Sequence, residues 1–443
     1  MKVVVIGTGP AGTFAALEAR RYDREAEVIL IGREKYPEYS HCGMPYVLSG
    51  EVKDFDELIS HPERFYKDVA KIDLRLETNT EKIFPKEKKI ITDKGEIEFD
   101  KLVIATGSSP FVPPIPGADL KGVSTLGSAE DLLKLKELAK GAKKAVVIGS
   151  GLVGLEAAIS LRDFGLEVTV VERMEKLMHQ MLDDEIAKEI ENYLESKDIK
   201  MHHGKSVEEI AGKDKVESVK FDGEALDCDL VVMATGMRCN TEIAKDAGIK
   251  IGKFGGIIID PEMKTNVDGI YAAGDCVECI DHITGKPTMS MLGTTAVKQG
   301  KVAGANVAGK KKKFPPVLNS AITKLFDIQA GSAGLTEDKL KEAGIDYISA
   351  KFKGETKCKY MPGNGELTIK LIADLKGRLL GCQVFGKEGV FARVSYLGLA
   401  IQKNMTLEEL TMAEIPYAPP ISPAVDPIYT VAELLMRKLE RTK

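Results

Sequence analysis

The stretch VVVIGTGPAG at residues 3–12 decides the fold of this chain, and AVVIGSGLVG at residues 145–154 repeats it. In each stretch a β-branched run leads into Gly-x-Gly-x-x-Gly, and a helix of small residues and a second apolar strand follow. This order predicts a β-α-β unit with a glycine turn, and two such units predict two doubly wound α/β domains. The helices are expected over 11–20 and 155–164, and the second strands over 27–31 and 167–171.

Three later segments indicate how the chain divides. The segments IEFDKLVIATG at 97–107 and CDLVVMATG at 228–236 each predict a strand that ends in a turn, and TNVDGIYAAGD at 265–275 predicts a strand aimed at an acidic turn. Beyond residue 318, short strands and helices alternate without a glycine loop, which predicts an α+β domain. The expected division is a discontinuous first nucleotide domain over 1–112 and 241–316, a second nucleotide domain over 113–240, and a C-terminal domain over 318–443.

The composition is that of a soluble globular protein with a large core. The chain has 443 residues, of which 44% are hydrophobic and 29% are charged, and its net charge is −5. An acidic balance argues against a nucleic-acid partner or an anionic membrane surface. No apolar run reaches the roughly 18 residues of a membrane helix, and the buried strand that follows Lys2 leaves no room for a signal peptide. We therefore expect a cytoplasmic protein without a membrane partner.

The cysteines do not form a disulfide framework, because there are seven of them and they are scattered along the chain. Cys276 and Cys279 are spaced as C-x-x-C, but no second pair and no zinc-like partner accompanies them. We therefore expect no metal site. Four others are expected to be core or surface residues: Cys228, Cys239, Cys358 and Cys382.

The first glycine loop predicts a pyrophosphate site. Gly7 gives a tight turn, Gly9 allows close approach of the backbone to the phosphates, and Gly12 allows the helix to pack closely on the strand. Far along the chain, Gly274-Asp275 ends a strand, and an aspartate there can hold a ribitol hydroxyl. Flavins contain ribitol and nicotinamide nucleotides do not, so this loop is predicted to bind FAD.

The second glycine loop predicts a different nucleotide. Its following strand ends on Glu172, 18 residues after Gly154. A carboxylate at this place accepts hydrogen bonds from the adenosine ribose and repels a 2′-phosphate, which favours NADH. Arg173 is adjacent and leaves NADPH possible.

The segment HCGMPY at 41–46 carries the candidate reactive group. Pro45 fits the first turn of a helix and Gly50 fits its end, so Cys42 is expected at a helix N-terminus. A helix dipole lowers the pKa of a thiol placed there. An isolated cysteine is more often buried and inert, but the polar residues 38–41 before Cys42 favour the reactive interpretation.

These segments, together with ATGSSP at 105–110, ATGMRCN at 234–240 and YAPPISPAVDP at 417–427, resemble the pyridine nucleotide-disulfide oxidoreductase superfamily over the full chain. The chain most resembles the single-cysteine branch, which contains coenzyme A-disulfide reductases, NADH oxidases, NADH peroxidases and NAD(P)H-dependent persulfide or polysulfide reductases. The resemblance implies FAD in the first domain, NAD(P)H in the second, and a homodimer formed through the third. It also implies that the partner's C-terminal domain closes the active site.

The resemblance assigns catalytic roles to Cys42 and, from the partner subunit, to Tyr417 and less closely to Tyr360. Gly32 stands where many members have the acid for the FAD ribose, so Glu34 is the substitute candidate. The other implied FAD contacts are Gly7, Gly9, Pro10, Ala11, Gly12, Ala105, Thr106, Gly107, Gly274, Asp275, Thr295 and Ala296. The implied nicotinamide-nucleotide contacts are Gly149, Gly151, Leu152, Val153, Gly154, Glu172 and Gly236.

Two further segments gain a role only through the resemblance. The residues 294–300 are implied to begin a helix aimed at the flavin pyrimidine, where the positive end of the dipole stabilises reduced flavin. Glu156 is implied to approach the flavin edge, and an ordinary helix position is an equal alternative.

The sequence also discriminates among the members of the superfamily. A dithiol mechanism is excluded, because Cys42 has no second cysteine in its segment. A C-terminal histidine acid is excluded, because the last histidine is His282. NADH peroxidases carry a histidine inside the first glycine loop, whereas this chain has Pro10, which has no proton to give.

These residues predict an FAD-dependent NAD(P)H oxidoreductase in which Cys42 reduces a small disulfide or persulfide: CoA disulfide, CoA persulfide or polysulfide. Of the positions that resemble CoA contacts only Arg21 agrees, and four differ: Phe14, Glu18, Glu38 and His41. One alternative is an NADH oxidase that reduces O2 through a cysteine sulfenic acid. Another is a non-catalytic redox-sensing flavoprotein, which turnover with NADH and a disulfide would exclude.

Overall fold

The first glycine loop begins a five-stranded parallel sheet. The computed structural model describes residues 1–442 of the chain. Its first sheet has the strand order β18 (Ile270–Ala272), β7 (Lys101–Ile104), β1 (Lys2–Ile6), β2 (Glu27–Ile31) and β3 (Asp73–Arg75). The central strands read as continuous β-branched runs because both faces of a parallel sheet are covered.

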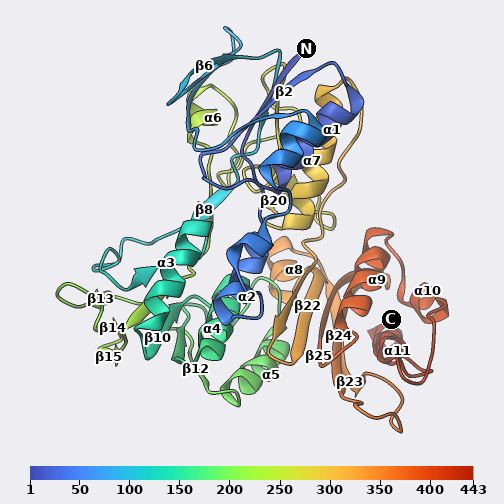
Figure 1. Cartoon of the computed structure of the whole chain (residues 1–443). Coiled ribbons are helices and arrows are strands. Elements are labelled where there is room, and N and C mark those ends of the chain that lie inside the picture. The colour runs from blue at the N-terminus through green and yellow to red at the C-terminus, as the bar shows by residue number, and fades with distance from the viewer. Residues whose placement is uncertain (443) are drawn as a thin grey trace.

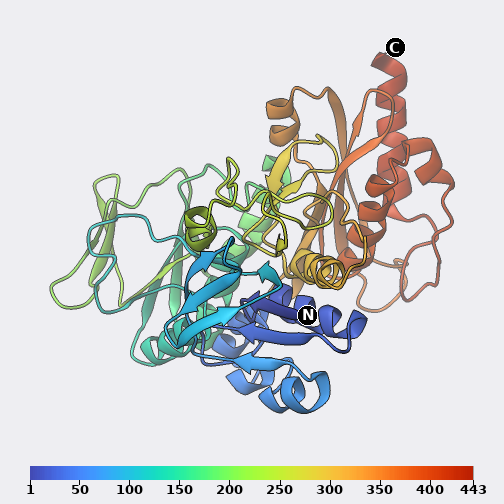
Figure 2. The same ribbon diagram turned by 90° about the horizontal axis from the view of Figure 1, so that it is seen from above.

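Helices α1 (Pro10–Tyr22) and α7 (Gly293–Val307) lie side by side against this sheet (Figures 1 and 2). Their approach is close, since a Cβ added at Gly300 would lie 2.2 Å from the carbonyl oxygen of Ala11, and one at Gly304 would lie 2.2 Å from that of Ala15. Glycine at these two positions therefore brings α7, which is distant in sequence, onto the helix that follows the first glycine loop.

The second glycine loop begins another five-stranded parallel sheet. The two predicted doubly wound sheets are thus confirmed, and each helix begins earlier than expected because the third glycine of its loop lies within the first turn. The strand order is β12 (Ile199–His202), β11 (Glu167–Val171), β10 (Lys144–Ile148), β16 (Leu230–Met233) and β9 (Val123–Ser124). The helices of this part are α3 (Ala129–Lys140), α4 (Leu152–Phe164) and α5 (Asp184–Glu195).

The C-terminal part is an antiparallel sheet with helices, which confirms the predicted α+β class. Helix α9 (Val390–Gln402) packs against β22 and β25, and α11 (Pro427–Thr442) packs against β23 and β24. The strand order is β21 (Ala321–Leu325), β22 (Ile328–Gly334), β25 (Leu379–Gly386), β24 (Glu366–Asp374) and β23 (Tyr347–Glu355). The two shorter helices are α8 (Glu337–Ala343) and α10 (Leu407–Met412).

The chain passes between the two nucleotide sheets at a short antiparallel ribbon of β8 (Ser108–Pro110) and β17 (Met237–Cys239) (Figure 1). The segment 97–107, expected as one strand, contains parts of two strands. Strand β6 (Gly95–Glu98) belongs to a separate antiparallel sheet, and β7 starts after it.

The remaining strands are β4 (Thr80–Phe84), β5 (Lys89–Thr92), β13 (Glu209–Ala211), β14 (Ser218–Phe221), β15 (Glu224–Asp227), β19 (Glu278–Ile280) and β20 (Pro287–Met289). The remaining α-helices are α2 (Met44–Ser49) and α6 (Glu242–Asp246).

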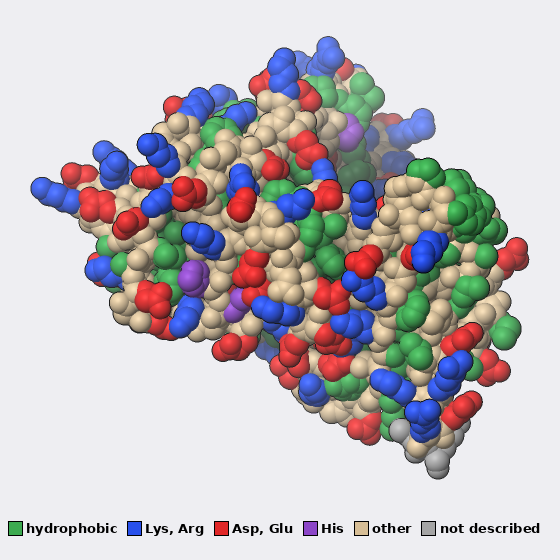
Figure 3. All heavy atoms as spheres, turned by 90° about the horizontal axis from the view of Figure 1, so that it is seen from below, with side chains coloured by type: hydrophobic (Ala, Val, Ile, Leu, Met, Phe, Trp, Pro, Cys, Tyr) green, Lys and Arg blue, Asp and Glu red, His purple; other side chains and the backbone are tan. Residues whose placement is uncertain are grey.

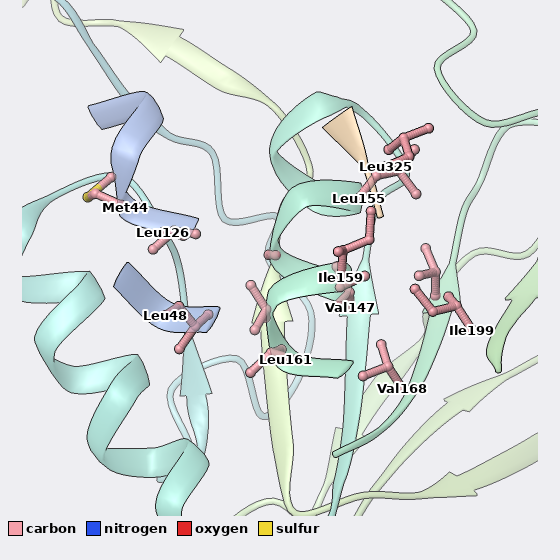
Figure 4. Close-up of a cluster of buried hydrophobic side chains, with 14 of the residues drawn as sticks. Met44, Leu48, Leu126, Val147, Leu155, Ile159, Leu161, Val168, Ile199 and Leu325 are labelled. Carbon is pink, nitrogen blue, oxygen red and sulfur yellow. The ribbon is translucent and has the colours of Figure 1, made fainter. Parts of the chain in front are cut away.

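One buried apolar cluster joins all three parts of the molecule. In Figure 4, Met44 and Leu48 of α2 lie beside the second nucleotide sheet and its helix α4. Leu325 of the C-terminal sheet packs near Leu155 of that helix in the same cluster. Full burial of a leucine such as Leu48 stabilises the fold by about 1.5–3 kcal/mol. The short helix that follows Cys42 is therefore fixed by contacts with parts of the chain far from it in sequence.

A buried ion-pair network attaches the C-terminal sheet to the second nucleotide part. The Lys370 ammonium on β24 is 1% exposed and lies 2.8 Å from Asp183, 2.6 Å from Glu185 and 2.6 Å from Glu337. Burial alone would lower the pKa of Lys370, but the hydrogen bonds to these carboxylates raise it. Gln383 exchanges two hydrogen bonds with Asp183, at 2.8 and 2.7 Å. Removal of one partner would leave a buried charge unpaired. The network therefore specifies one placement of the C-terminal sheet against the second nucleotide part.

The surface drawn in Figure 3 carries Lys and Arg side chains interspersed with Asp and Glu, and no continuous basic tract crosses it. Across residues 1–442, none of the helices has both the length and the apolar content that a membrane crossing needs.

Candidate functional site

A cavity of about 1050 Å3 opens where the strands of the first sheet end. Its wall contains the residues that follow four of the parallel strands: Gly7 after β1, Gly32 after β2, Ala105 after β7 and Gly274 close after β18. The carboxyl edge of an open parallel sheet is where such folds bind their ligands. This volume lies just above the range of roughly 300–1,000 Å3 that is usual for ligand sites.

The glycine loop on this wall fits a pyrophosphate. A Cβ added at Gly7 would lie 2.0 Å from the carbonyl oxygen of Ala105, and one at Gly12 would lie 1.8 Å from that of Gly7. A Cβ at Gly9 would meet no protein atom within 4 Å, because this glycine faces the cavity. The backbone is thus open only where phosphates must approach the N-terminus of α1. The residues present therefore fit FAD.

Two carboxyl groups expected to hold the flavin nucleotide are on the same wall. Glu34 accepts a hydrogen bond from the Tyr39 hydroxyl at 2.7 Å, and Asp275 accepts one from the Ser108 hydroxyl at 3.1 Å. Burial raises the pKa of Asp275, while the hydrogen bond from Ser108 lowers it. Sequence reasoning missed Tyr39, whose buried ring gave no signal apart from its place beside the cysteine segment.

Most of the predicted FAD contacts line the cavity. Gly12 does not, because it packs against Gly7 inside the loop. Thr295 does not either, and its hydroxyl instead hydrogen-bonds to that of Ser290 at 3.0 Å. The predicted residues on the wall are Gly7, Gly9, Pro10, Ala11, Glu34, Ala105, Thr106, Gly107, Gly274, Asp275 and Ala296.

Cys42 is exposed on the cavity wall, in a 3-10 turn (His41–Gly43) that leads directly into α2. The expectation that a helix dipole lowers its pKa is wrong. Burial raises the pKa of the thiol, and the nearby carboxyl groups of Glu156 and Asp275 raise it further. The six-residue helix α2 is short, and its dipole does not offset two carboxyl groups and the loss of solvent. Cys42 is therefore accessible, but it is protonated more strongly than a free thiol.

Glu156 comes to this cavity from α4, the helix of the second glycine loop. Its carboxyl group accepts a hydrogen bond of 2.7 Å from the hydroxyl of Thr323, which lies on β21 of the C-terminal sheet. Burial raises the pKa of Glu156, and the hydrogen bond from Thr323 lowers it. The chemistry at Cys42 is thus influenced by all three parts of the chain. The contribution of Thr323 has no signal in the sequence.

The second glycine loop repeats the geometry of the first at a separate place. A Cβ at Gly149 would lie 2.3 Å from the carbonyl oxygen of Ala234, and one at Gly154 would lie 2.1 Å from that of Gly149. Glu172 accepts hydrogen bonds from the Ser150 amide at 2.7 Å and the Ser150 hydroxyl at 2.8 Å. Of the predicted nicotinamide-nucleotide contacts, only Val153 also lines the flavin cavity. The others do not line it: Gly149, Gly151, Leu152, Gly154, Glu172 and Gly236.

The two predicted catalytic tyrosines are not on the cavity wall of their own chain. Tyr417 is 50% exposed and Tyr360 is 74% exposed, both in loops of the C-terminal part. They gather with Cys358, whose sulfur lies 3.9 Å from the Tyr417 hydroxyl. Hydrogen bonds to Cys358 and Tyr417 raise the pKa of Tyr360 to about 12. Within one chain these residues and Cys42 form two separate groups.

A dinucleotide cavity with a thiol on its wall, next to a second nucleotide loop, defines a flavin- and nicotinamide-dependent oxidoreductase. The chain belongs to the pyridine nucleotide-disulphide oxidoreductase family, whose model matches residues 1–300. The model of the family's dimerisation domain matches residues 320–428. The enzyme uses FAD and NAD(P)H, as predicted.

Known proteins resemble the chain over nearly its whole length. An NADH oxidase of Methanocaldococcus jannaschii is 43% identical, with 99% of each chain covered. An NAD(P)H coenzyme A polysulfide/persulfide reductase of Pyrococcus horikoshii is 35% identical, with 98% of each covered. A solved NAD-dependent persulfide reductase of A. fulgidus is 39% identical and superposes with a TM-score of 0.98, covering 100% of this chain and 84% of the other.

Proposed function

We propose that this enzyme reduces a small persulfide, polysulfide or disulfide through Cys42, with electrons from NAD(P)H. The observation that carries the proposal is the thiol itself. Cys42 is the only cysteine on the wall of the flavin cavity among residues 1–442, and it is exposed there. The second sulfur of any S–S bond must therefore come from the substrate.

The chemistry needs little more than this thiol. Bound FAD supplies two-electron transfer between NAD(P)H and the sulfur site. The Cys42 thiolate attacks the S–S bond of a substrate RSSR, a Cys42–S–S–R bond forms, and RS⁻ leaves and takes up a proton. Two electrons then cleave that bond, which returns the Cys42 thiolate and releases a second RSH after protonation. The sum is RSSR + NAD(P)H + H⁺ → 2 RSH + NAD(P)⁺.

A persulfide of a low-molecular-weight thiol, with CoA persulfide the first to test, is the favoured substrate. Two similar proteins are named as persulfide reductases. The Arg21 guanidinium, the one matching CoA contact, donates a hydrogen bond to the Glu18 carboxylate at 3.0 Å. Its charge is thus partly offset, which weakens a phosphate site. A persulfide or polysulfide needs fewer contacts than CoA disulfide.

The enzyme is proposed to work as a homodimer in which Tyr417 and Tyr360 reach the partner's Cys42. The exposed apolar surface supports this arrangement. In the described part of the chain, every large apolar side chain that is more than half exposed, apart from Val69, lies beyond residue 355. These residues are Tyr360, Phe391, Leu399, Met412, Ile421 and Val425.

The nucleotide preference is proposed to be NADH over NADPH. The Glu172 carboxylate is held at the end of β11 by the amide and hydroxyl of Ser150, at the place where a ribose would bind. A fixed negative charge there repels a 2′-phosphate. The adjacent Arg173 leaves some use of NADPH.

The domain division proposed from the sequence, with 1–112 and 241–316 in the FAD part, 113–240 in the NAD(P)H part and 318–443 at the C-terminus, agrees with the sheet connections. Strand β18 returns to the first sheet beside β7, and α7 returns to α1.

A second candidate function is NADH oxidation by O2, because the M. jannaschii relative is named an NADH oxidase. In that reaction Cys42 would cycle through a sulfenic acid. The two candidates differ in which acceptor supports the faster turnover at equal concentration.

The deciding experiment is Cys42→Ser. With CoA persulfide, polysulfide and CoA disulfide as acceptors, the variant is expected to lose sulfur reduction while NADH still reduces its flavin. Cys239→Ser is the matched control, since that thiol lies near Asp275 but does not line the cavity. Sulfur reduction at the native rate by the Cys42 variant would overturn the proposal.

A further inference from the structure

His41 is the one histidine on the cavity wall in the described chain, and it precedes Cys42 in the same 3-10 turn. The proposed reaction releases two thiolates at each turnover, and each sulfur needs a proton. An imidazole both donates and accepts a proton near neutral pH, which suits it to this task.

The ring of His41 is held in place by Tyr39. The two rings are stacked, with their centroids 4.3 Å apart and an angle of 20° between their planes. Tyr39 itself is 3% exposed, and its hydroxyl donates to Glu34 at 2.7 Å and accepts from the Ala129 amide at 2.9 Å. A buried, doubly hydrogen-bonded tyrosine thus fixes the orientation of the imidazole that precedes Cys42 in the chain.

The carboxyl groups near the thiol already have partners. Glu156 accepts a hydrogen bond from Thr323 at 2.7 Å, Asp275 accepts one from Ser108 at 3.1 Å, and Glu38 lies 3.4 Å from the ring of His61. No group among residues 1–442 hydrogen-bonds to the ring nitrogens of His41. The imidazole therefore has both nitrogens available for a ligand in the cavity.

We propose that His41 is the proton donor of this active site, protonating the sulfur that leaves when Cys42 attacks the substrate. The inference rests on the proposed function and supplies the proton that it requires. The imidazolium gives its proton to RS⁻, so that RSH leaves, and the neutral imidazole then takes up from solvent the proton that appears in the overall equation. This acid belongs to the same subunit as Cys42, in contrast to the tyrosines expected from the partner.

The test compares two acceptors with different leaving groups in the FAD-loaded enzyme. An alkyl disulfide such as CoA disulfide releases a basic thiolate, whereas 5,5′-dithiobis(2-nitrobenzoate) releases an aromatic thiolate that leaves without a proton. His41→Gln is expected to lower kcat with CoA disulfide by about 100-fold, the usual size of general acid catalysis. It should change kcat with the aromatic disulfide by less than about threefold, on the same principle.

Two further variants complete the design. His41→Ala should regain part of its CoA disulfide activity when imidazole is added to the buffer, which a structural role of His41 would not allow. His61→Gln is the matched control, because this histidine packs on Phe65 and Tyr66 and does not line the cavity. It should leave the ratio of the two activities unchanged.

Equal losses with both acceptors in His41→Gln, or no loss with either, would overturn the proposal for His41. Its failure is separable from failure of the proposed function. Cys42→Ser reports on the function alone, because the thiol is required whichever group supplies the proton. Reduction of the flavin by NADH, followed at its absorbance, should be native in all the histidine variants and excludes a general loss of folding.

Discussion

The two glycine loops of this enzyme have the same backbone geometry, and we propose that they bind different nucleotides. In the first, a Cβ at Gly12 would meet the carbonyl oxygen of Gly7 at 1.8 Å, and in the second, a Cβ at Gly154 would meet that of Gly149 at 2.1 Å. The first glycine of each loop has a positive φ, 112° and 107°. This shared frame fixes a turn and the N-terminus of a helix, and it carries no information about the nucleotide.

The difference lies in the first residue after the second strand. In the second unit this residue is Glu172, whose carboxylate is bound by Ser150 of the loop. In the first unit it is Gly32, and a Cβ there would lie 2.4 Å from the hydroxyl oxygen of Thr8, the loop residue that corresponds to Ser150. Thr8 therefore fills the space that a side chain would need. We propose that Glu34, two residues later, takes the acidic role. At this position the two loops differ by one methyl group, that of Thr8.

The largest effect should come from replacing the third glycine of one loop at a time. Gly12→Ala places a methyl group into a backbone carbonyl, so we expect a protein that does not retain FAD and is destabilised by about 3 kcal/mol or more. Gly154→Ala should keep FAD and lose NADH-dependent flavin reduction. The measurements are absorbance of the purified protein and anaerobic reduction by NADH.

Gly9→Ala is the control for that pair, since its methyl group would meet no protein atom within 4 Å. It should fold normally and bind FAD weakly. A yellow Gly12→Ala protein with native FAD content would show that the loop tolerates the contact.

The next largest effect should come from replacing the two acidic residues Glu172 and Glu34. Glu172→Ala removes a hydrogen bond to the ribose of NADH, so kcat/KM for NADH should fall by about 10-fold, as expected for the loss of one charged hydrogen bond. It also removes the charge that repels a 2′-phosphate, so the preference for NADH over NADPH should narrow. Glu34→Ala should weaken FAD binding and leave the NADH to NADPH ratio unchanged. Steady-state kinetics with both nucleotides check the two variants. A native enzyme that prefers NADPH would contradict the assignment of Glu172.

A smaller effect is expected from Glu156, which approaches Cys42 from the second nucleotide part. Burial and the carboxyl groups of Glu156 and Asp275 raise the pKa of Cys42. Removing one negative charge favours the thiolate, so Glu156→Gln should lower that pKa. Alkylation of Cys42 by iodoacetamide at pH 8 should then be up to about tenfold faster, as one pKa unit allows.

Thr323→Val provides a graded version of this test. The hydrogen bond from Thr323 lowers the pKa of Glu156, so its loss should raise that pKa and leave more of the carboxyl group neutral. The pKa of Cys42 should then fall, but by less than in Glu156→Gln. An alkylation rate that is unchanged in both variants would show that Glu156 does not act on the thiol.

The smallest effect distinguishes the two loop hydroxyls. Ser150→Ala removes one of the two hydrogen bonds that Ser150 makes to Glu172 and should raise KM for NADH about threefold, within the range of a single hydrogen bond. Thr8→Ser keeps a hydroxyl under Gly32 and should leave FAD binding unchanged. Equal effects of both substitutions on NADH kinetics would contradict separate roles for the two loops.

Much of this architecture was predictable because its signals are local. A glycine loop requires particular backbone angles and close contacts, so its residues are restricted in type wherever the unit occurs. Cys42 was also identifiable, since its segment and its isolation from other cysteines are visible in the chain. The error in its pKa arose because the helix dipole is a local feature, whereas Glu156 and Asp275 approach from helices and strands more than 100 residues away.

The sequence by itself determined the two β-α-β units and the class of the C-terminal part, and it predicted Cys42 as the reactive thiol. Each of these depends on residues close together in the chain. Only the tertiary structure decided the electrostatic environment of Cys42, the hydrogen bond from Thr323 to Glu156, and the stacking of His41 on Tyr39. Such properties depend on distances between side chains from different elements, and packing sets those distances only when the sheets and helices come together.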